Sequence, residues 1–446
     1  MESVPLRGRP GTKTLPLADG RAVGGPIALG LLASYVAVAL GGWVAAAVAL
    51  LVAAPELAAR DPLASQPVLA AHLVALGLLP FAVTGASFHL LPVMLRNDIR
   101  HPRRLQVALP LLGGGFLVAP GVAFGRSSLL WPGATLLTAG LALVLWELLA
   151  LVQWAPKGRT LIVSRVGVAL ASFHAAAALV LGALVFSRGD APVAGVVHGR
   201  WLLVHLHLAV FGWLTLLIVT VGRTLAPMLA QAPVAPARRF PLSELALMGG
   251  LWTLLAGLAA SSRPATLAGG CAILLTLAQF ARLLMRVARS RRLELEAPLA
   301  HLLAGVLFLL QAAALGTAIL VGAVAPRTGL TAYVVLLLLG WAGGVTLGHL
   351  GKLLSLSLWV WWPPGPRPKQ NELYPRRAWL AEAALFATGV ELLAAGAFAG
   401  SVGVARAGGA VLTVASALAA WGAAWTWARR PHRTATSTFL KEGSER

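Results

Sequence analysis

Two histidines separated by one residue lie inside a long apolar segment of the sequence, which runs from Trp201 to Leu229. An imidazole can bind a metal or a haem iron through one ring nitrogen while the other nitrogen donates a hydrogen bond. On an α-helix, positions i and i+2 are about 200° apart, so His205 and His207 face different neighbours. Polar groups in a bilayer are expensive and usually functional, so this helix is expected to lie between two sites.

The composition restricts which other chemistry these histidines could join. The 446 residues are 58% hydrophobic and only 11% charged, which is typical of a multi-span membrane protein. Cys271 is the single cysteine, so a disulfide framework, a cysteine metal site or an iron–sulfur cluster within this chain is excluded. The net charge of +21 falls mostly between the apolar runs, so we expect the lipid bilayer as a partner and no nucleic acid.

The apolar runs predict the elements that must position the histidines. Twelve runs are long enough to cross about 30 Å of hydrocarbon. We therefore expect an all-α polytopic membrane bundle of about 12 transmembrane helices, forming one domain over residues 24–429 between tails at 1–23 and 430–446. The predicted spans are 24–54, 66–95, 105–124, 128–154, 161–187, 197–229, 241–260, 264–288, 295–324, 329–363, 376–402 and 406–429.

The basic residues predict the orientation of the bundle. When the connections are numbered alternately and helix-end Arg165, Arg223 and Lys352 are counted with their nearest connection, all but seven of the 36 Lys and Arg fall in the N-terminal segment, the even connections and the C-terminal tail. By the positive-inside rule, both termini are expected in the cytoplasm of a bacterial-type inner membrane. The second, sixth and tenth spans then all run from outside to inside. The seven exceptions are Arg60, Arg126, Arg188, Arg200, Arg263, Arg327 and Arg406.

A weak internal repeat relates three of these spans. In the second and sixth spans a histidine is followed at +5 by glycine and at +20 by proline, and the residues are His72, Gly77, Pro92 and His207, Gly212, Pro227. The tenth span keeps the pair Gly340-Trp341, which matches Gly212-Trp213, but has Val335 at the histidine position. Because these elements recur four spans apart, the pattern predicts a bundle pseudo-repeated in blocks of four helices.

The repeat places two histidines at a comparable depth in the outer half of the membrane. Axial ligation of haem requires two imidazoles at one depth on facing helices, and His72 and His207 meet that condition. His205 would then face a second site. The alternative for each histidine is a hydrogen bond to a neighbouring backbone or to water, as buried polar groups require.

The pattern His-x-His-x-x-x-x-Gly-Trp, followed by Leu-x-Pro at the inner end of the span, resembles the histidine-bearing helix of haem-copper oxidase subunit I proteins. It is most similar to the C-type oxidases, the nitric oxide reductases and the NnrS membrane haem proteins. The resemblance implies that His72 and His207 hold a low-spin haem b and that His205 binds a second haem, if one is present. It also implies a cytochrome or another redox subunit as partner.

The sequence departs from that superfamily at the copper site. The histidine-rich helix is the sixth span rather than the tenth, and the seventh span, Leu242–Ala260, contains no histidine. Because the copper-binding His-His pair is missing, we do not expect copper or a binuclear reduction centre. The sequence therefore indicates a divergent relative that binds one or two haems.

Several other polar residues are weaker candidates. His349 and His89 lie at similar depth in the tenth and second spans and could hold a second metal or haem, while His174 could supply a copper ligand. The remaining histidines, His101, His198, His301 and His432, are expected to be solvated. The buried carboxylates Glu147, Glu382 and Glu391 could relay protons, or could pair with Arg165 or form interhelical hydrogen bonds.

These observations support electron transfer or the handling of nitric oxide or oxygen by a haem-b membrane protein. Two alternatives remain open. One is a haem-free secondary transporter, because repeated helices interrupted by small residues and proline also build binding sites near the midplane. The other is an atypical terminal oxidase or nitric oxide reductase subunit, an oxidoreductase whose copper ligands would include His174 or His205.

Overall fold

The computed structural model of the protein describes residues 26–155, 165–188, 197–233, 240–292, 294–363 and 365–431. The regular structure within these ranges is helical, and twelve spans in them are long and apolar enough to cross a membrane. Residues 1–23 and 432–446, which make up most of the two expected tails and include His432, lie outside the described residues. The prediction of an all-α polytopic bundle is confirmed.

Each observed span overlaps its predicted run. The first five are α1 (Leu29–Val52), α3–η1–α4 (Ser65–His72, Leu73–Leu78, Leu79–Leu95), α5–α6 (Pro102–Leu112, Gly115–Ala123), α7 (Ser127–Gln153) and α8 (Arg165–Arg188). The sixth to ninth are α9–η3–α10 (His198–His207, Leu208–Thr215, Leu216–Leu229), α11 (Phe240–Ala260), α12 (Arg263–Ser290) and α13 (Ala297–Leu320). The last three are α14–η4–α15 (Pro326–Val334, Val335–Gly343, Gly344–Val360), α16 (Arg376–Ala399) and α17 (Val402–Ala428). Two short helices, α2 (Ala54–Ala58) and η5 (Gln370–Leu373), lie in connections.

The local sequence explains why these runs are helices and where some of them begin. Hydrocarbon offers backbone groups no hydrogen-bond partner, so an isolated span must satisfy them internally. Helix α12 begins after Ser262, whose hydroxyl accepts a hydrogen bond from the amide of Ala265, and α17 begins in the same way after Ser401. The hydroxyls of Thr135, Thr138 and other span residues bond to carbonyls one turn earlier in their own helices.

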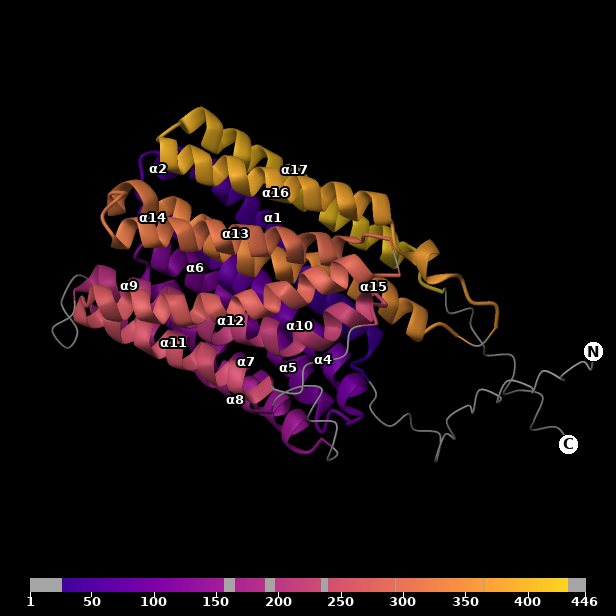
Figure 1. Cartoon of the computed structure of the whole chain (residues 1–446). Helices are drawn as coiled ribbons and strands as arrows, with labels where there is room; N and C mark the ends of the chain where they lie inside the picture. The colour runs from indigo at the N-terminus through magenta and orange to yellow at the C-terminus, as the bar shows by residue number, and fades with distance from the viewer. Residues whose placement is uncertain are drawn as a thin grey trace, which may run out of the picture.

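The packing of the spans follows three blocks of four. The third and fourth span of each block form an antiparallel pair, namely α5–α6 with α7, α11 with α12, and α16 with α17. The first span of each block packs on the second, namely α1 on η1, α8 on η3 and α13 on η4. Figure 1 shows the spans packed side by side, with their helix axes roughly parallel to one another. The blocks agree with the internal repeat seen in the sequence.

The second, sixth and tenth spans meet at the centre of the bundle. The π-helical segment η4 contacts both η1 and η3, and α15 contacts α4. The tenth span is the most enclosed, with 78% of its most apolar stretch buried compared with 28% for α13. On the tenth span, the indole N–H of Trp341 donates a hydrogen bond of 2.8 Å to the hydroxyl of Thr215 on the sixth span. The three repeated spans therefore form the core around which the other nine are arranged.

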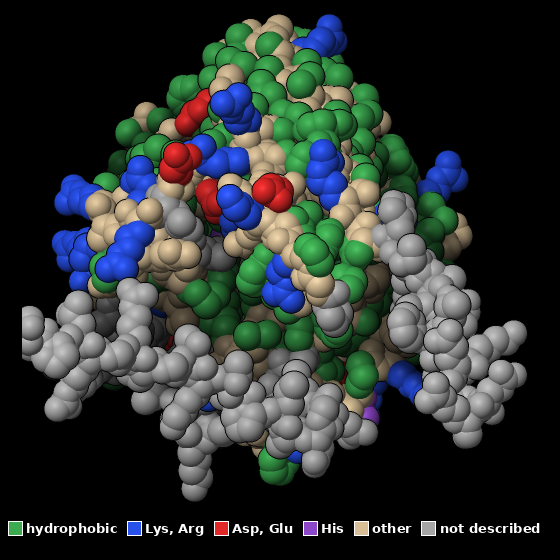
Figure 2. All heavy atoms as spheres, turned by 90° about the vertical axis from the view of Figure 1, so that its right-hand side faces the viewer, with side chains coloured by type: hydrophobic (Ala, Val, Ile, Leu, Met, Phe, Trp, Pro, Cys, Tyr) green, Lys and Arg blue, Asp and Glu red, His purple; other side chains and the backbone are tan. Residues whose placement is uncertain are grey.

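Charged side chains gather at one end of the bundle. This end, which we call the basic end, holds the connections around Arg96–Arg104, Arg291–Glu296 and Trp361–Arg376. Figure 2 looks onto it and shows more Lys and Arg than Asp and Glu among the described residues. Because the number of spans is even, α1 begins and α17 ends at this same end.

Candidate functional site

The repeated spans are broken by π-helix at the same place. His72 is the last residue before η1, His207 is the last residue before η3, and η4 begins at Val335. These are the positions that the sequence repeat aligned. A π-helical turn inserts one extra residue, shifts the side chains that follow, and is frequent at functional sites. The repeat is thus expressed in the backbone as well as in the sequence.

A glycine in each π segment allows a neighbouring span to approach closely. A Cβ atom added to Gly212 would lie 2.8 Å from the His174 ring, and one added to Gly340 would lie 2.7 Å from the Phe308 ring. In the first block, a Cβ on Gly42 would lie 2.4 Å from the backbone of Gly77. The motif glycines therefore fix the contact between the first and second span of each block, and in the second block that contact is a histidine.

The ring of His207 has partners on both nitrogens. Nδ1 donates to the carbonyl of Leu203, 2.7 Å away and one turn earlier in α9. Since a carbonyl can only accept, Nε2 carries the lone pair and accepts a hydrogen bond of 2.6 Å from the Tyr333 hydroxyl on α14. The rings of Phe211 and Tyr333 stack against it at 5.9 and 5.8 Å between centroids. Nε2 of His207 thus points toward the tenth span.

His72 and His205 lie near one another. Nδ1 of His72 donates to the carbonyl of Val68 at 2.8 Å, and Nδ1 of His205 donates to the carbonyl of Ala178 on α8 at 2.9 Å. The two imidazoles are close enough to interact electrostatically. Among the described residues, no hydrogen bond or ring contact joins His72 to His207. Pairing of His72 and His207 on one haem therefore stays a prediction.

The weaker candidate histidines occupy three separate places. His174 is fully buried in α8, with Nδ1 bonded to the Leu170 carbonyl and Nε2 without a hydrogen-bond partner among the described residues. His89 is buried against the Ser357 hydroxyl of α15 at 3.0 Å. His349 donates from Nδ1 to the Val345 carbonyl at 2.7 Å and lines a cavity. In the described ranges, no three His, Cys, Asp or Glu side chains form a metal-binding group.

The expectation that His301 is solvated was wrong. His301 is 1% exposed, and its Nε2 lies 2.8 Å from a carboxylate oxygen of Glu382, which is fully buried in α16. The reason is the close packing of α13 on α15, because a Cβ on Gly348 would lie 2.4 Å from His301. Because Gly348 has no side chain, there is room for the imidazole of His301 inside the bundle.

Glu147 forms an interhelical hydrogen bond, which is one of the alternatives that the sequence left open. Its carboxylate accepts hydrogen bonds from the guanidinium of Arg104 at 2.8 Å and from the amide of His101 at 3.2 Å. Arg165, the partner in the other alternative, donates to the carbonyl of Ala155. Glu391 forms an interhelical hydrogen bond of 2.6 Å with Gln311, as one of the alternatives anticipated. These contacts are structural ones between neighbouring spans.

Sequence reasoning missed the partner of His207. Tyr333 is one of only three tyrosines in the chain, and it lies two residues before the position aligned with the histidines. A rare phenol beside the repeat position was the available signal. Its importance depends on the close, parallel packing of the sixth and tenth spans, which hydropathy does not report.

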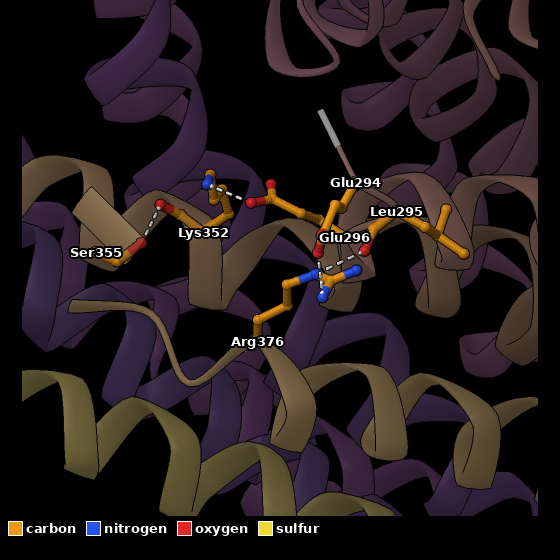
Figure 3. Close-up of polar contacts among 6 residues, drawn as sticks. All are labelled: Glu294, Leu295, Glu296, Lys352, Ser355 and Arg376. Atoms are coloured by element: carbon orange, nitrogen blue, oxygen red, sulfur yellow. Dashed lines mark hydrogen bonds and ion pairs between the residues drawn. The ribbon is translucent and has the colours of Figure 1, made fainter. Parts of the chain in front are cut away.

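The polar residues at the basic end were missed as a group. Lys352 on α15 donates to the carboxylate of Glu296 at 2.8 Å, and its ammonium lies 4.9 Å from the centre of the Tyr374 ring. Arg376 forms an ion pair with Glu294 at 2.5 Å and a hydrogen bond with the Leu295 carbonyl at 3.0 Å. Figure 3 shows that these residues, which come from α15, α16 and the segment before α13, meet at the N-terminal end of α13.

Comparison with known proteins adds no family to this description. No protein-family model matches the chain, and no curated protein matches it at a significant level. What can be stated from the structure is that the chain is an integral membrane protein of twelve candidate spans in three repeated blocks, with histidines at the breaks of two repeated spans.

Proposed function

We propose that this chain is a haem-binding integral membrane protein that acts in electron transfer or in handling a diatomic gas such as nitric oxide or oxygen. One observation supports the proposal above the others. His72 and His207 occupy equivalent positions directly before a π segment, and each donates Nδ1–H to a carbonyl of its own helix. Metal-binding histidines almost always make such a bond, because it fixes the ring and leaves Nε2 for the metal.

The residues present fit a b-type haem by their chemistry. His72 and His207 would supply the axial nitrogens, and His205, whose Nδ1 is also bonded to a carbonyl, would serve a second haem. A bound haem supplies reversible one-electron chemistry or a site for a gas. The surrounding spans would exclude water and hold the imidazoles neutral. To bind haem iron, Nε2 of His207 would have to give up its hydrogen bond with the hydroxyl of Tyr333, which is a local change.

The test of this proposal is an absorption spectrum of purified protein, oxidised and reduced, after expression with adequate haem supply. A reducible haem spectrum is expected, and a haem assay relative to protein will give one or two haems per chain. Protein that remains colourless would overturn the proposal. Colourless protein that moves a solute across vesicles would support the transporter alternative, and about one copper per chain would support the oxidase alternative.

Replacing Tyr333 with Phe is expected to increase haem affinity. In the haem-free protein the Tyr333 hydroxyl satisfies Nε2 of His207, so its removal leaves a buried acceptor unpaired, at a cost of about 1–3 kcal/mol to that state alone. We expect haem titration of the haem-free variant to show binding about tenfold tighter than the wild type. Thr215→Val is the matched control, because it removes the other hydrogen bond between the same two spans. Unchanged or weaker haem binding in Tyr333→Phe would contradict the prediction.

A further inference from the structure

A long apolar cavity lies between the three repeated spans, on the basic side of the π segments. It measures about 120 Å³ and is lined by α4, α10 and α15, with Leu214 of η3 and Leu302 of α13. Along the sixth span it extends from Leu214 in η3 to Ala226 in α10, which corresponds to about 18 Å of helix. Its walls are aliphatic, with side chains such as Val83, Leu217 and Val221. We call this cavity the slot. A narrow aliphatic body fits such a surface best.

His349 lies at the boundary between the slot and a polar mouth. The imidazole lines the slot and also lines a second, smaller cavity of about 20 Å³, whose other walls include Arg291, Glu294 and Glu296. That second cavity is at the basic end, beside the ion pairs of Figure 3. A molecule in the slot would therefore present its apolar body to the repeated spans and its head to His349.

The tautomer of His349 restricts the chemistry of that head. Nδ1 lies 2.7 Å from the carbonyl of Val345 and must donate to it, so Nε2 carries the lone pair. A neutral imidazole in this state recognises a hydrogen-bond donor through Nε2. A hydroxyl group meets that requirement, whereas an ether or a ketone of the same shape offers no donor.

Among the described residues, two of the three cations near the mouth, Lys352 and Arg376, are already paired with carboxylates. The ammonium of Lys352 is already paired with Glu296, and Arg376 is paired with Glu294. Burial raises the pKa of Tyr374, and the nearby carboxylates of Glu296 and Glu382 raise it further, so this phenol also stays neutral. Lys352 and Arg376 are thus balanced by carboxylates and offer no unpaired cation to a fatty acid carboxylate, while Arg291, which lines the mouth, donates to the carbonyl of Ala288.

We propose that the slot binds a neutral apolar molecule with a hydroxyl head, a long-chain alcohol or an alkylphenol, whose hydroxyl donates to Nε2 of His349. The apolar body lies along α4, α10 and α15. This site is separate from the proposed haem ligands His72, His205 and His207, and binding there does not depend on haem.

The experiment compares 4-hexylphenol with 4-hexylanisole, its methyl ether, on wild-type protein in nanodiscs. The fraction bound is measured by equilibrium dialysis, and empty nanodiscs give the correction for lipid partitioning. The two probes share the hexylphenyl body, but the ether carries a methyl group in place of the donated hydrogen and partitions more strongly into lipid. We expect the phenol to bind about tenfold tighter than the ether, as one hydrogen bond to a buried acceptor predicts. Equal affinity would overturn the proposal without reference to any variant.

Two variants locate the binding in the slot. His349→Phe keeps a ring of similar size and removes the lone pair, so the preference for phenol over ether is expected to disappear. Val221→Trp fills the slot, and both probes should lose binding. His101→Ala, at an exposed histidine near the same end, is the control and should bind like the wild type. A phenol preference that survives in His349→Phe would overturn the proposal.

The experiments test the haem proposal and the slot proposal independently of each other. Colourless wild-type protein that prefers the phenol would remove the haem and leave the slot as proposed. Conversely, loss of haem absorbance in His349→Phe, with folding unchanged by size exclusion, would show that Nε2 of His349 binds iron, and would overturn the hydroxyl site.

Discussion

Purified His72→Ala and His207→Ala variants are expected to lose the absorption spectrum of a bis-histidine haem. The physical reason is that the porphyrin itself would be held mainly by apolar contacts, while the two iron–nitrogen bonds fix its position and spin state. Both histidines donate Nδ1–H to a carbonyl of their own helix, so under the proposal each alanine variant removes an imidazole that is already oriented to bind iron. The measurement is the reduced-minus-oxidised spectrum per mole of protein.

Three comparisons make this experiment specific. His101→Ala removes an exposed histidine and is expected to retain the full spectrum. His205→Ala is expected to retain the first haem and to lose the second if the wild type contains two. Added imidazole should restore absorbance to His207→Gly, because it replaces the missing ligand without repairing any other contact. A full spectrum in both His72→Ala and His207→Ala would exclude them as ligands.

Glu382→Ala is expected to reduce the free energy of unfolding by about 3–5 kcal/mol, the usual effect of removing one partner of a buried pair. His301 and Glu382 are 1% and 0% exposed, and their side chains are 2.8 Å apart. Removing the carboxylate leaves the imidazole in an apolar interior, where its ring also contacts Phe386. Reversible unfolding in mixed micelles by denaturing detergent would measure the change.

The same helix offers a matched control. Glu391 also lies in α16 and also bonds to a side chain of α13, but its contact with Gln311 is exposed on the outside of the bundle. Glu391→Ala is expected to change stability by less than about 1 kcal/mol, since interhelical hydrogen bonds in membranes average about 0.6 kcal/mol. Glu382→Gln keeps a hydrogen-bonding group and should fall between the two. Equal effects of Glu382→Ala and Glu391→Ala would contradict the assignment.

Loss of the His301–Glu382 pair is also expected to affect binding in the proposed slot. His301 packs against Gly348, the residue before His349, at the interface of α13 and α15. Gly348 permits that interface, since its missing side chain admits the His301 ring. A loss of the pair with Glu382 would therefore disturb the span that carries His349, and measurements of probe binding in Glu382 variants require a check of folding first.

The sequence by itself determined the twelve spans, their approximate ends and the three-block repeat. Hydropathy is a property of each stretch alone, and a bilayer requires a helix wherever such a stretch crosses it. The repeat was visible because histidine, glycine and proline recur at the same spacings in the second and sixth spans, and in both spans a π segment begins directly after the histidine.

Only the tertiary structure decided which side chains meet. Hydropathy does not fix the rotation of a helix about its axis, and a π segment changes that rotation part of the way along a span. Helix rotation set by packing places Tyr333 against His207 and His301 against Glu382, and His349, which lies beyond the π segment η4, lines the slot. Each of these contacts joins spans that are far apart in sequence, so its geometry follows from packing rather than from spacing.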